Sequence, residues 1–245
     1  FHFEDDNLTL DIERAKRLFK EIAKLIHENN GLIVVDGAQS VPHIKTNVIE
    51  DDIDFLAFSA HKMLGPTGTG VLYGKYIYLD KMKPIFYGGG MNSRFESTKE
   101  IEYKTLPLRL EAGTQNIAGV LGLSASIDYL NSIGINKIHE HELELKNYLL
   151  EKLKSIDNIT VYNKNTDSGI VVFNIDNIFS EDTSRYLNHY HIFVRAGNHC
   201  TKMVKDELGI KNTCRISFYL YNTKEEIDKL IEVLKNNKDS YEIIL

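Results

Sequence analysis

One lysine of this chain stands where an apolar run ends and a glycine-rich loop begins. Lys62 lies in FSAHKMLGPTGTG, residues 58–70, with Ser59 and His61 before it and three glycines after it. A lysine amine can form a Schiff base with an aldehyde, so an aldehyde cofactor is one explanation of this position. A surface lysine beside a turn has the same spacing and is the alternative.

Other polar residues have the types that such a cofactor needs. Pyridoxal phosphate requires a carboxylate that keeps its ring nitrogen protonated, and hydrogen-bond donors for its phosphate and ring hydroxyl. Asp36 ends one apolar run and is followed by Gln39, while Ser59 and His61 end another. These residue types favour a pyridoxal phosphate site around Lys62. Taken alone, Asp36 could equally begin a turn.

The glycine loop does not match two common phosphate-binding loops. A P-loop needs a lysine directly after its last glycine, but Val71 follows Gly70. A dinucleotide fingerprint that began at Gly68 would need a glycine where Tyr73 stands. Neither a P-loop nor a dinucleotide site is therefore predicted.

Short apolar runs predict the strands that would position these residues. LIVV at 32–35 and FLAF at 55–58 are wholly apolar, as strands buried on both faces of a sheet would be, and VLY at 71–73 predicts a third strand. Helical spacing alternates with these runs, so we predict an α/β fold with a mainly parallel sheet and flanking helices. Ligands bind at the carboxyl ends of such strands, where Asp36 and Lys62 would both lie.

Helical spacing precedes and follows these strands. A first helix is expected from Thr9 or Asp11 until Gly31, and helical spacing returns from Asn116. We predict a large domain over 1–130 and a smaller α/β domain over 131–245. The segments predicted for the smaller domain are the helices ELELKNYLLEKL (142–153) and TKEEIDKLIEVLKNN (223–237) and the strands TVY (160–162), GIVVFNI (169–175), IFVRA (192–196) and CRISFYL (214–220).

Composition excludes several classes of function. The net charge of −6 gives no general attraction to nucleic acid or to an anionic membrane. No apolar run approaches the ~20 residues that span a bilayer. Two cysteines, Cys200 and Cys214, are too few for a disulfide scaffold, so a reducing compartment such as the cytoplasm is expected, with an organelle not excluded.

The two cysteines have different surroundings. Cys214 lies in an apolar strand pattern and is expected in the core, whereas Cys200 follows the polar stretch RAGNH. Because the thiolate is the reactive form of cysteine, positive charge from Arg195 and His199 would favour reactivity at Cys200. A zinc site is not predicted, since no C-x-x-C or H-x-x-x-H pair accompanies His199 and Cys200.

Five motifs together resemble a known family. They resemble the class V aminotransferases of fold-type I pyridoxal phosphate enzymes, and within them the group II, SufS-type cysteine desulfurases. The similarity runs from about residue 31 to the end in the family's order, while the family's amino-terminal part has no counterpart here. The motifs are VDGAQSVPH (35–43), FSAHKMLGPTGTGVLYG (58–74), EAGTQN (111–116), RAGNHC (195–200) and CRISFYLYNTKEEID (214–228).

The resemblance implies a role for each residue of the first group. Lys62 would hold the cofactor covalently and later act as a base. Asp36 would pair with the pyridine nitrogen, and Gln39 with the ring's phenolic oxygen. Ser59 and His61 would bind the phosphate.

It implies further roles along the chain. Thr114 would reach the phosphate of a neighbouring subunit in a homodimer, Arg215 would bind the substrate carboxylate, and Cys200 would be the nucleophile. The activity implied is transfer of sulfur from L-cysteine to Cys200 as a persulfide, which leaves L-alanine. A small SufU- or SufE-like acceptor would then carry the sulfur to iron–sulfur cluster assembly.

Two alternatives remain open at this point. A selenocysteine lyase would use the same residues with a preference for selenium. A truncated, inactive homologue would act through contacts with a partner, and would hold no cofactor at Lys62.

Overall fold

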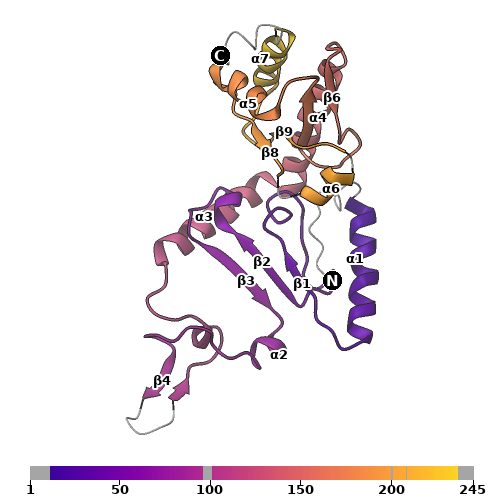
Figure 1. The fold of residues 1–245 in the computed structure, drawn as a ribbon. Helices are drawn as coiled ribbons and strands as arrows, with labels where there is room; N and C mark the ends of the chain where they lie inside the picture. Colours follow the sequence, from indigo (N-terminus) through magenta and orange to yellow (C-terminus); the bar gives the residue numbers. More distant parts are fainter. Residues whose placement is uncertain (1–11, 96–100, 200, 208, 237–245) are drawn as a thin grey trace. The chain divides into compact units, whose positions relative to one another are not determined.

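The computed structural model describes residues 12–95, 101–199, 201–207 and 209–236 (Figure 1). Its contacts form two compact units. The first, which we call the Lys62 unit, runs from Leu18 to Ile135. The second, the Arg215 unit, joins the described residues up to Arg17 to those from Asn136 onward. Helix α1 (Ile12–Glu28) contributes residues to both.

Three strands form the sheet of the Lys62 unit, in the order β1 (Val34–Asp36), β2 (Phe55–Ser59) and β3 (Gly70–Gly74) (Figure 1). β1 and β2 are parallel, but β3 is antiparallel to β2. The predicted mainly parallel sheet is therefore wrong for β3, and the α/β sheet is mixed. The short loop before Gly70 explains this, because parallel neighbours need a long crossover and antiparallel ones do not.

The apolar composition of these strands had predicted burial on both faces of the sheet. The structure does not have this arrangement. Ile33 and Leu56 are buried, whereas Val34 is 69% exposed and Leu72 is 55% exposed. Within the described residues, the sheet thus buries one set of its apolar side chains and leaves another set in contact with solvent.

A charged network ties α1 to the start of β2. The Asp54 carboxylate, which is fully buried, accepts hydrogen bonds from the Ile33 amide at 2.8 Å and from His27 Nε2 at 2.7 Å. Lys75 Nζ lies 2.8 Å from its other oxygen. Asp54 precedes β2, so this network lies at the edge of the sheet opposite Lys62.

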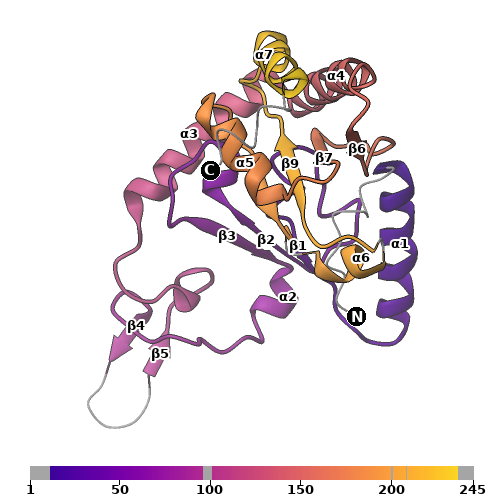
Figure 2. The same cartoon turned by 45° about the horizontal axis from the view of Figure 1, so that its top comes forward.

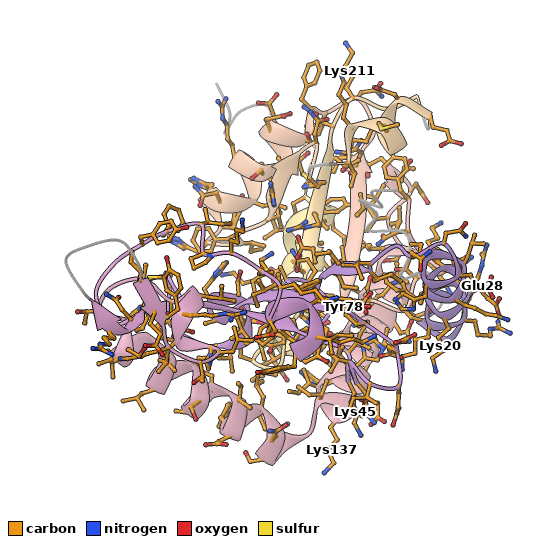
Figure 3. All side chains as sticks on the ribbon, turned by 90° about the horizontal axis from the view of Figure 1, so that it is seen from below. Lys20, Glu28, Lys45, Tyr78, Lys137 and Lys211 are labelled. Atoms are coloured by element: carbon orange, nitrogen blue, oxygen red, sulfur yellow. The ribbon has the colours of Figure 1, made fainter. Side chains whose placement is uncertain are left out.

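Two further parts complete the Lys62 unit. The short helix α2 (Tyr76–Leu79) follows β3, and its Tyr78, labelled in Figure 3, packs against Phe55 with the rings tilted by 34° and their centroids 6.1 Å apart. The hairpin of β4 (Asn92–Phe95) and β5 (Ile101–Tyr103) extends away from the sheet, as Figure 2 shows. The one-turn helix η3 (Leu108–Leu110) and the long helix α3 (Ile117–Ile133) follow.

The Arg215 unit is built on an antiparallel sheet. Its strand order is β6 (Ile159–Val161), β7 (Ile170–Ile175), β9 (Thr213–Ser217) and β8 (Arg195–Gly197). Residues of β7 alternate between buried and half-buried, the period expected of a strand with one face on the core. Its helices are α4 (Ile135–Leu153), α5 (Ser180–His189), α6 (Lys202–Glu207) and α7 (Lys224–Lys235).

The core of this unit lies between the sheet and the helices α4, α5 and α7. Cys214 is fully buried in this core, so the prediction for it is confirmed. The side chains of this cluster with at most 1% exposure are Leu145, Leu149, Val171, Phe173, Ile175, Tyr186, Leu187, Cys214, Ile227 and Leu234. None of the described helices combines the length and the apolar character needed to cross a membrane.

Candidate active site

The parallel pair of strands places the first group of predicted residues at one edge of the sheet. Asp36 is the last residue of β1 and Ser59 the last of β2. The register sets Asp36 opposite Ala57, two residues before Ser59. His61 and Lys62 follow at once, in the one-turn helix η2 (Ala60–Met63). Parallel strands end at the same edge, which explains this grouping.

The turn that carries Lys62 is closed by backbone hydrogen bonds. The Ala60 amide donates to the Thr69 carbonyl at 2.9 Å, and the Gly65 amide donates to the Ala60 carbonyl at 2.9 Å. Leu64 ends the turn with a φ of 62°, in the left-handed region. A Cβ on Gly65 would lie only 2.9 Å from the Ala60 carbonyl oxygen, so this position needs glycine. Lys62 itself is half-buried.

The turn after β1 is fixed in a similar way. Asp36 Oδ1 accepts a hydrogen bond from the Ala38 amide at 2.9 Å, while the Gly37 amide donates to the Ala57 carbonyl of β2 at 2.8 Å. The side chains of Asp36 and Gln39 are exposed. Asp36 therefore has a fixed backbone and a carboxylate that remains accessible to a ligand.

Thr114 lies in the segment that leads into α3. It is exposed, and the preceding Gly113, with a φ of 82°, donates its amide to the Gly89 carbonyl at 2.9 Å. This bond joins the EAGTQN segment to the GGG loop at 88–90. All six cofactor-binding candidates, Asp36, Gln39, Ser59, His61, Lys62 and Thr114, thus belong to the Lys62 unit.

Sequence patterns missed the importance of Asn116. Its side-chain oxygen accepts the Gly119 amide at 3.0 Å and so caps α3, while its Nδ2 donates to Thr69 Oγ1 at 2.9 Å. An asparagine directly before an apolar helical pattern is a signal for such a cap. The bond to Thr69, 47 residues away in the chain, had no signal in the sequence.

Of the remaining predicted residues, the structure describes Arg215, which belongs to the Arg215 unit. Arg215 lies in β9, directly opposite Arg195 of the edge strand β8. Cys200, the predicted nucleophile, lies outside the described residues. The structure therefore describes the two arginines and the residues on either side of Cys200.

His199 does not supply the positive charge that its place in the sequence suggested. The residue is 7% exposed, and its Nε2 donates to the Thr213 carbonyl at 2.9 Å. Burial and the nearby Lys205 ammonium lower the pKa of His199 to about 4, so the ring is neutral at neutral pH. The His199 ring therefore adds no positive charge to this segment at neutral pH.

Lys205 is an unusual residue of this segment because its side chain is only 4% exposed. Its ammonium donates to the Gly197 carbonyl. Gly197 and His199 both have positive φ values, 118° and 52°. Across the described ranges, no group of three histidine, cysteine, aspartate or glutamate side chains has a geometry suited to a metal ion.

Comparison with known proteins gives the family. The aminotransferase class-V family model matches residues 17–230. The chain belongs to this family. A relative named probable cysteine desulfurase, from Halalkalibacterium halodurans, is 46% identical over 222 residues, which cover 91% of this chain and 54% of the relative. The cysteine desulfurase of Haloferax volcanii is 40% identical, covering 94% of this chain and 59% of the relative.

Solved structures of the family agree with the fold. The cysteine desulfurase CsdA of Escherichia coli superposes with a TM-score of 0.82 at 34% identity, over 96% of this chain and 56% of that one. The apo cysteine desulfurase of Thermococcus onnurineus gives 0.83 at 33% identity, over 96% and 65%. The predicted α/β class is confirmed. The chain spans little more than half the length of the curated family members it matches.

Proposed function

We propose that this chain carries the lysine-bearing part of a pyridoxal phosphate-dependent cysteine desulfurase of the SufS type. The observation that carries this proposal is the placement of Asp36 and Lys62 at the ends of two adjacent parallel strands. It is supported by relatives named cysteine desulfurase that are 40% and 46% identical to the chain.

The residues at this edge of the sheet fit pyridoxal phosphate chemically. The donor set comprises one amine, one accessible carboxylate and a serine and a histidine at the end of the neighbouring strand. In the proposal, Lys62 holds the aldehyde carbon, Asp36 the ring nitrogen and Gln39 the phenolic oxygen. Ser59 and His61 bind the phosphate. When bound, the cofactor supplies an electron sink for the substrate's α-carbon.

The chain's own groups would move and hold the protons. The Asp36 carboxylate keeps a proton on the ring nitrogen, because an anion beside that nitrogen favours its charged form. The Lys62 amine, once free, takes the proton from the substrate's α-carbon, as a general base within reach of that atom can. Arg215 presents a planar guanidinium, which suits two-point binding of the substrate carboxylate.

Sulfur transfer would occur at Cys200. Its thiolate attacks the sulfur of L-cysteine, so that a sulfur–sulfur bond forms and the substrate's Cβ–sulfur bond breaks. The products are a persulfide on Cys200 and L-alanine, which together contain all the atoms of the enzyme thiol and L-cysteine. The overall reaction therefore needs no external oxidant or reductant.

The wider assignments also belong to this proposal. Thr114 of one subunit binds the cofactor phosphate of the other, so the active form is a homodimer. The persulfide passes to a SufU- or SufE-like acceptor and supplies iron–sulfur cluster assembly. The cytoplasm is the proposed compartment.

Trapping with borohydride tests the cofactor assignment. The chain is incubated with pyridoxal phosphate, reduced, digested and analysed by mass spectrometry. A pyridoxyl adduct confined to the peptide with Lys62, and lost in Lys62→Arg, is expected. Adducts spread over surface lysines such as Lys45 and Lys137, or none at all, would refute the assignment.

The sulfur-transfer step needs a separate measurement. The rate of L-alanine release from L-cysteine should fall by roughly a hundredfold or more in Cys200→Ser. It should stay near its original value in Cys214→Ser. Equal rates with Cys200→Ser would rule out the persulfide mechanism. The same assay with L-selenocysteine separates a desulfurase from a selenocysteine lyase.

A further inference from the structure

The turn that carries Lys62 depends on residue 69 for its closure. The Ala60 amide at the start of η2 donates to the Thr69 carbonyl at 2.9 Å, and Gly70 next to it pairs with Ser59 in the β2–β3 ladder. Whatever fixes Thr69 therefore fixes the start of the turn, two residues before Lys62.

Asn116 holds Thr69 from the other side. Its Nδ2 donates to Thr69 Oγ1 at 2.9 Å, and its Oδ1 accepts the Gly119 amide at 3.0 Å. One side-chain amide thus joins the glycine loop to the first turn of α3. Because the two bonds use opposite ends of the amide, they fix its orientation as well as its position.

Two glycines of α3 allow this close approach. A Cβ on Gly119 would lie 2.1 Å from Thr69 Oγ1 and 2.4 Å from Asn116 Nδ2. One turn further along, a Cβ on Gly122 would lie 2.7 Å from Cγ of Pro66, within the same loop. Glycine inside a helix costs about 1 kcal/mol relative to alanine, so two glycines facing one loop indicate that contact with the loop outweighs this cost.

We propose that Asn116 and Thr69 are positioning residues for Lys62, and that their hydrogen bond fixes the lysine-bearing turn against α3. The bond acts through the backbone of Thr69 and Ala60 and requires no contact with a ligand. It also joins the Lys62 turn to the EAGTQN segment, since Asn116 is the last residue of that motif and Thr114 lies two residues before it. The role toward the cofactor rests on the function proposed above.

Three substitutions distinguish the effect of this hydrogen bond from a general loss of fold stability. Thr69→Val removes the hydroxyl and keeps the shape, whereas Thr69→Ser restores the hydroxyl. Asn116→Ser keeps a side-chain oxygen that can cap α3 but removes the amide donor. Asn116 is exposed, so water can bind its amide in Thr69→Val, and that variant is expected to fold. Thr46→Val, which removes a threonine hydroxyl elsewhere in the Lys62 unit, is the matched control.

The first readout is amide hydrogen exchange of Ala60 and Gly65, which requires no cofactor. Exchange is expected to be about fivefold faster in Thr69→Val and in Asn116→Ser, and unchanged in Thr69→Ser and Thr46→Val. The double variant should resemble each single variant, because both remove one bond. Unchanged exchange in Thr69→Val, or effects that simply add in the double variant, would overturn the proposal.

The second readout is the pyridoxal phosphate concentration that gives half-maximal pyridoxyl adduct at Lys62 after reduction. It should rise about fivefold in Thr69→Val and Asn116→Ser, with rescue in Thr69→Ser. Faster exchange without this rise would mean that the bond stabilises the loop but does not position Lys62, and would also overturn the proposal. If the unsubstituted chain forms no adduct at Lys62, the proposed function fails, and hydrogen exchange alone decides whether the bond fixes the turn.

Discussion

Arg195 and Arg215 lie directly opposite one another in the antiparallel ladder of β8 and β9. Residues in that relationship project from the same face of a sheet, with Cβ atoms about 4.5–5.5 Å apart. Two guanidinium groups are therefore gathered on one face, next to the segment that contains Cys200. Like charges directly opposite each other in a sheet repel, and this repulsion is destabilising.

The first prediction is that removing this repulsion stabilises the fold. Arg195→Gln should raise the free energy of unfolding by about 0.5 kcal/mol at low salt, because like charges opposite each other in a sheet are destabilising. The gain should shrink as salt screens the charges. Urea unfolding at two salt concentrations measures it. A gain that does not depend on salt would mean that the effect is not electrostatic.

The neutral state of His199 gives a second prediction. Burial and Lys205 lower its pKa to about 4, whereas the unfolded value is 6.5. The unfolded state therefore takes up the proton first as the pH falls, so the stability that His199 contributes is present above pH 6.5 and is lost toward pH 4. His199→Gln keeps a donor in the place of Nε2 and cannot titrate.

Two measurements check the His199 prediction. As the pH falls from 6.5 to 4, the original chain should lose stability relative to His199→Gln. In NMR spectra, the ring signals of His199 should stay constant from pH 8 to about 5.5. A titration midpoint near 6.5 would contradict the burial of the ring.

Lys146 of α4 supports a third prediction, which concerns alkaline pH. Its side chain is 1% exposed and its ammonium donates to the carbonyl and the hydroxyl of Thr166. Burial lowers its pKa to about 8, with partial opposition from Asp167. The unfolded state keeps the proton up to about pH 10.5, so the folded state should gain stability as the pH rises from 8 to 10.5.

The comparison with Lys146→Met isolates this gain. Relative to that variant, the original chain should become more stable by roughly 2–3 kcal/mol over this range, as an upper estimate. Lys137→Met, at an exposed lysine of the same helix labelled in Figure 3, should show no such trend. Parallel pH profiles for Lys146→Met and the original chain would show that Lys146 ionises as a solvated lysine does.

A fourth prediction compares two aspartates that share their partners. Asp54 is fully buried and Asp52 is half exposed, and both lie within 3.0 Å of His27 and Lys75. Burial raises the pKa of Asp54, but hydrogen bonds from Lys75, the Ile33 amide and His27 outweigh it and hold the pKa below the usual value. Its contribution to stability is therefore lost only as the pH falls through that lowered pKa.

Neutral substitutions at these two positions should differ in cost. Asp54→Asn is expected to cost about 3 kcal/mol, because it leaves the Lys75 ammonium beside a buried group that no longer carries charge. Asp52→Asn should cost less than about 1 kcal/mol, since exposed ion pairs contribute little. Urea unfolding followed by circular dichroism measures both. Similar losses would mean that burial does not govern this network.

The grouping of Asp36, Ser59, His61 and Lys62 could be predicted because it follows from local rules. Apolar runs mark the strands, parallel strands end at one edge, and the structure has this arrangement for β1 and β2. The direction of β3 was predictable as well, from the short loop before Gly70, but composition alone suggested a parallel strand. A short loop is stronger evidence of strand direction than an apolar run.

Other features depend on contacts between residues that are far apart in the chain. No pattern around His199 reveals that the Thr213 carbonyl and Lys205 lie against its ring, and these neighbours reverse its expected charge. The bond between Asn116 and Thr69 is similar, because helix capping predicts only half of what the amide does. Sequence patterns identify residue types and strand ends. Packing decides which groups are protonated and which distant residues are joined by hydrogen bonds.

The exposed apolar strands of the Lys62 unit have a practical consequence. Within the described part of the chain, β1 and β3 each pair with one strand only, and Val34 and Leu72 are exposed. An uncovered apolar edge is a template on which another copy can add its own strand, so concentrated preparations are expected to aggregate. Low protein concentration is therefore the condition in which the chemistry of Lys62 can be measured before self-association removes the protein from solution.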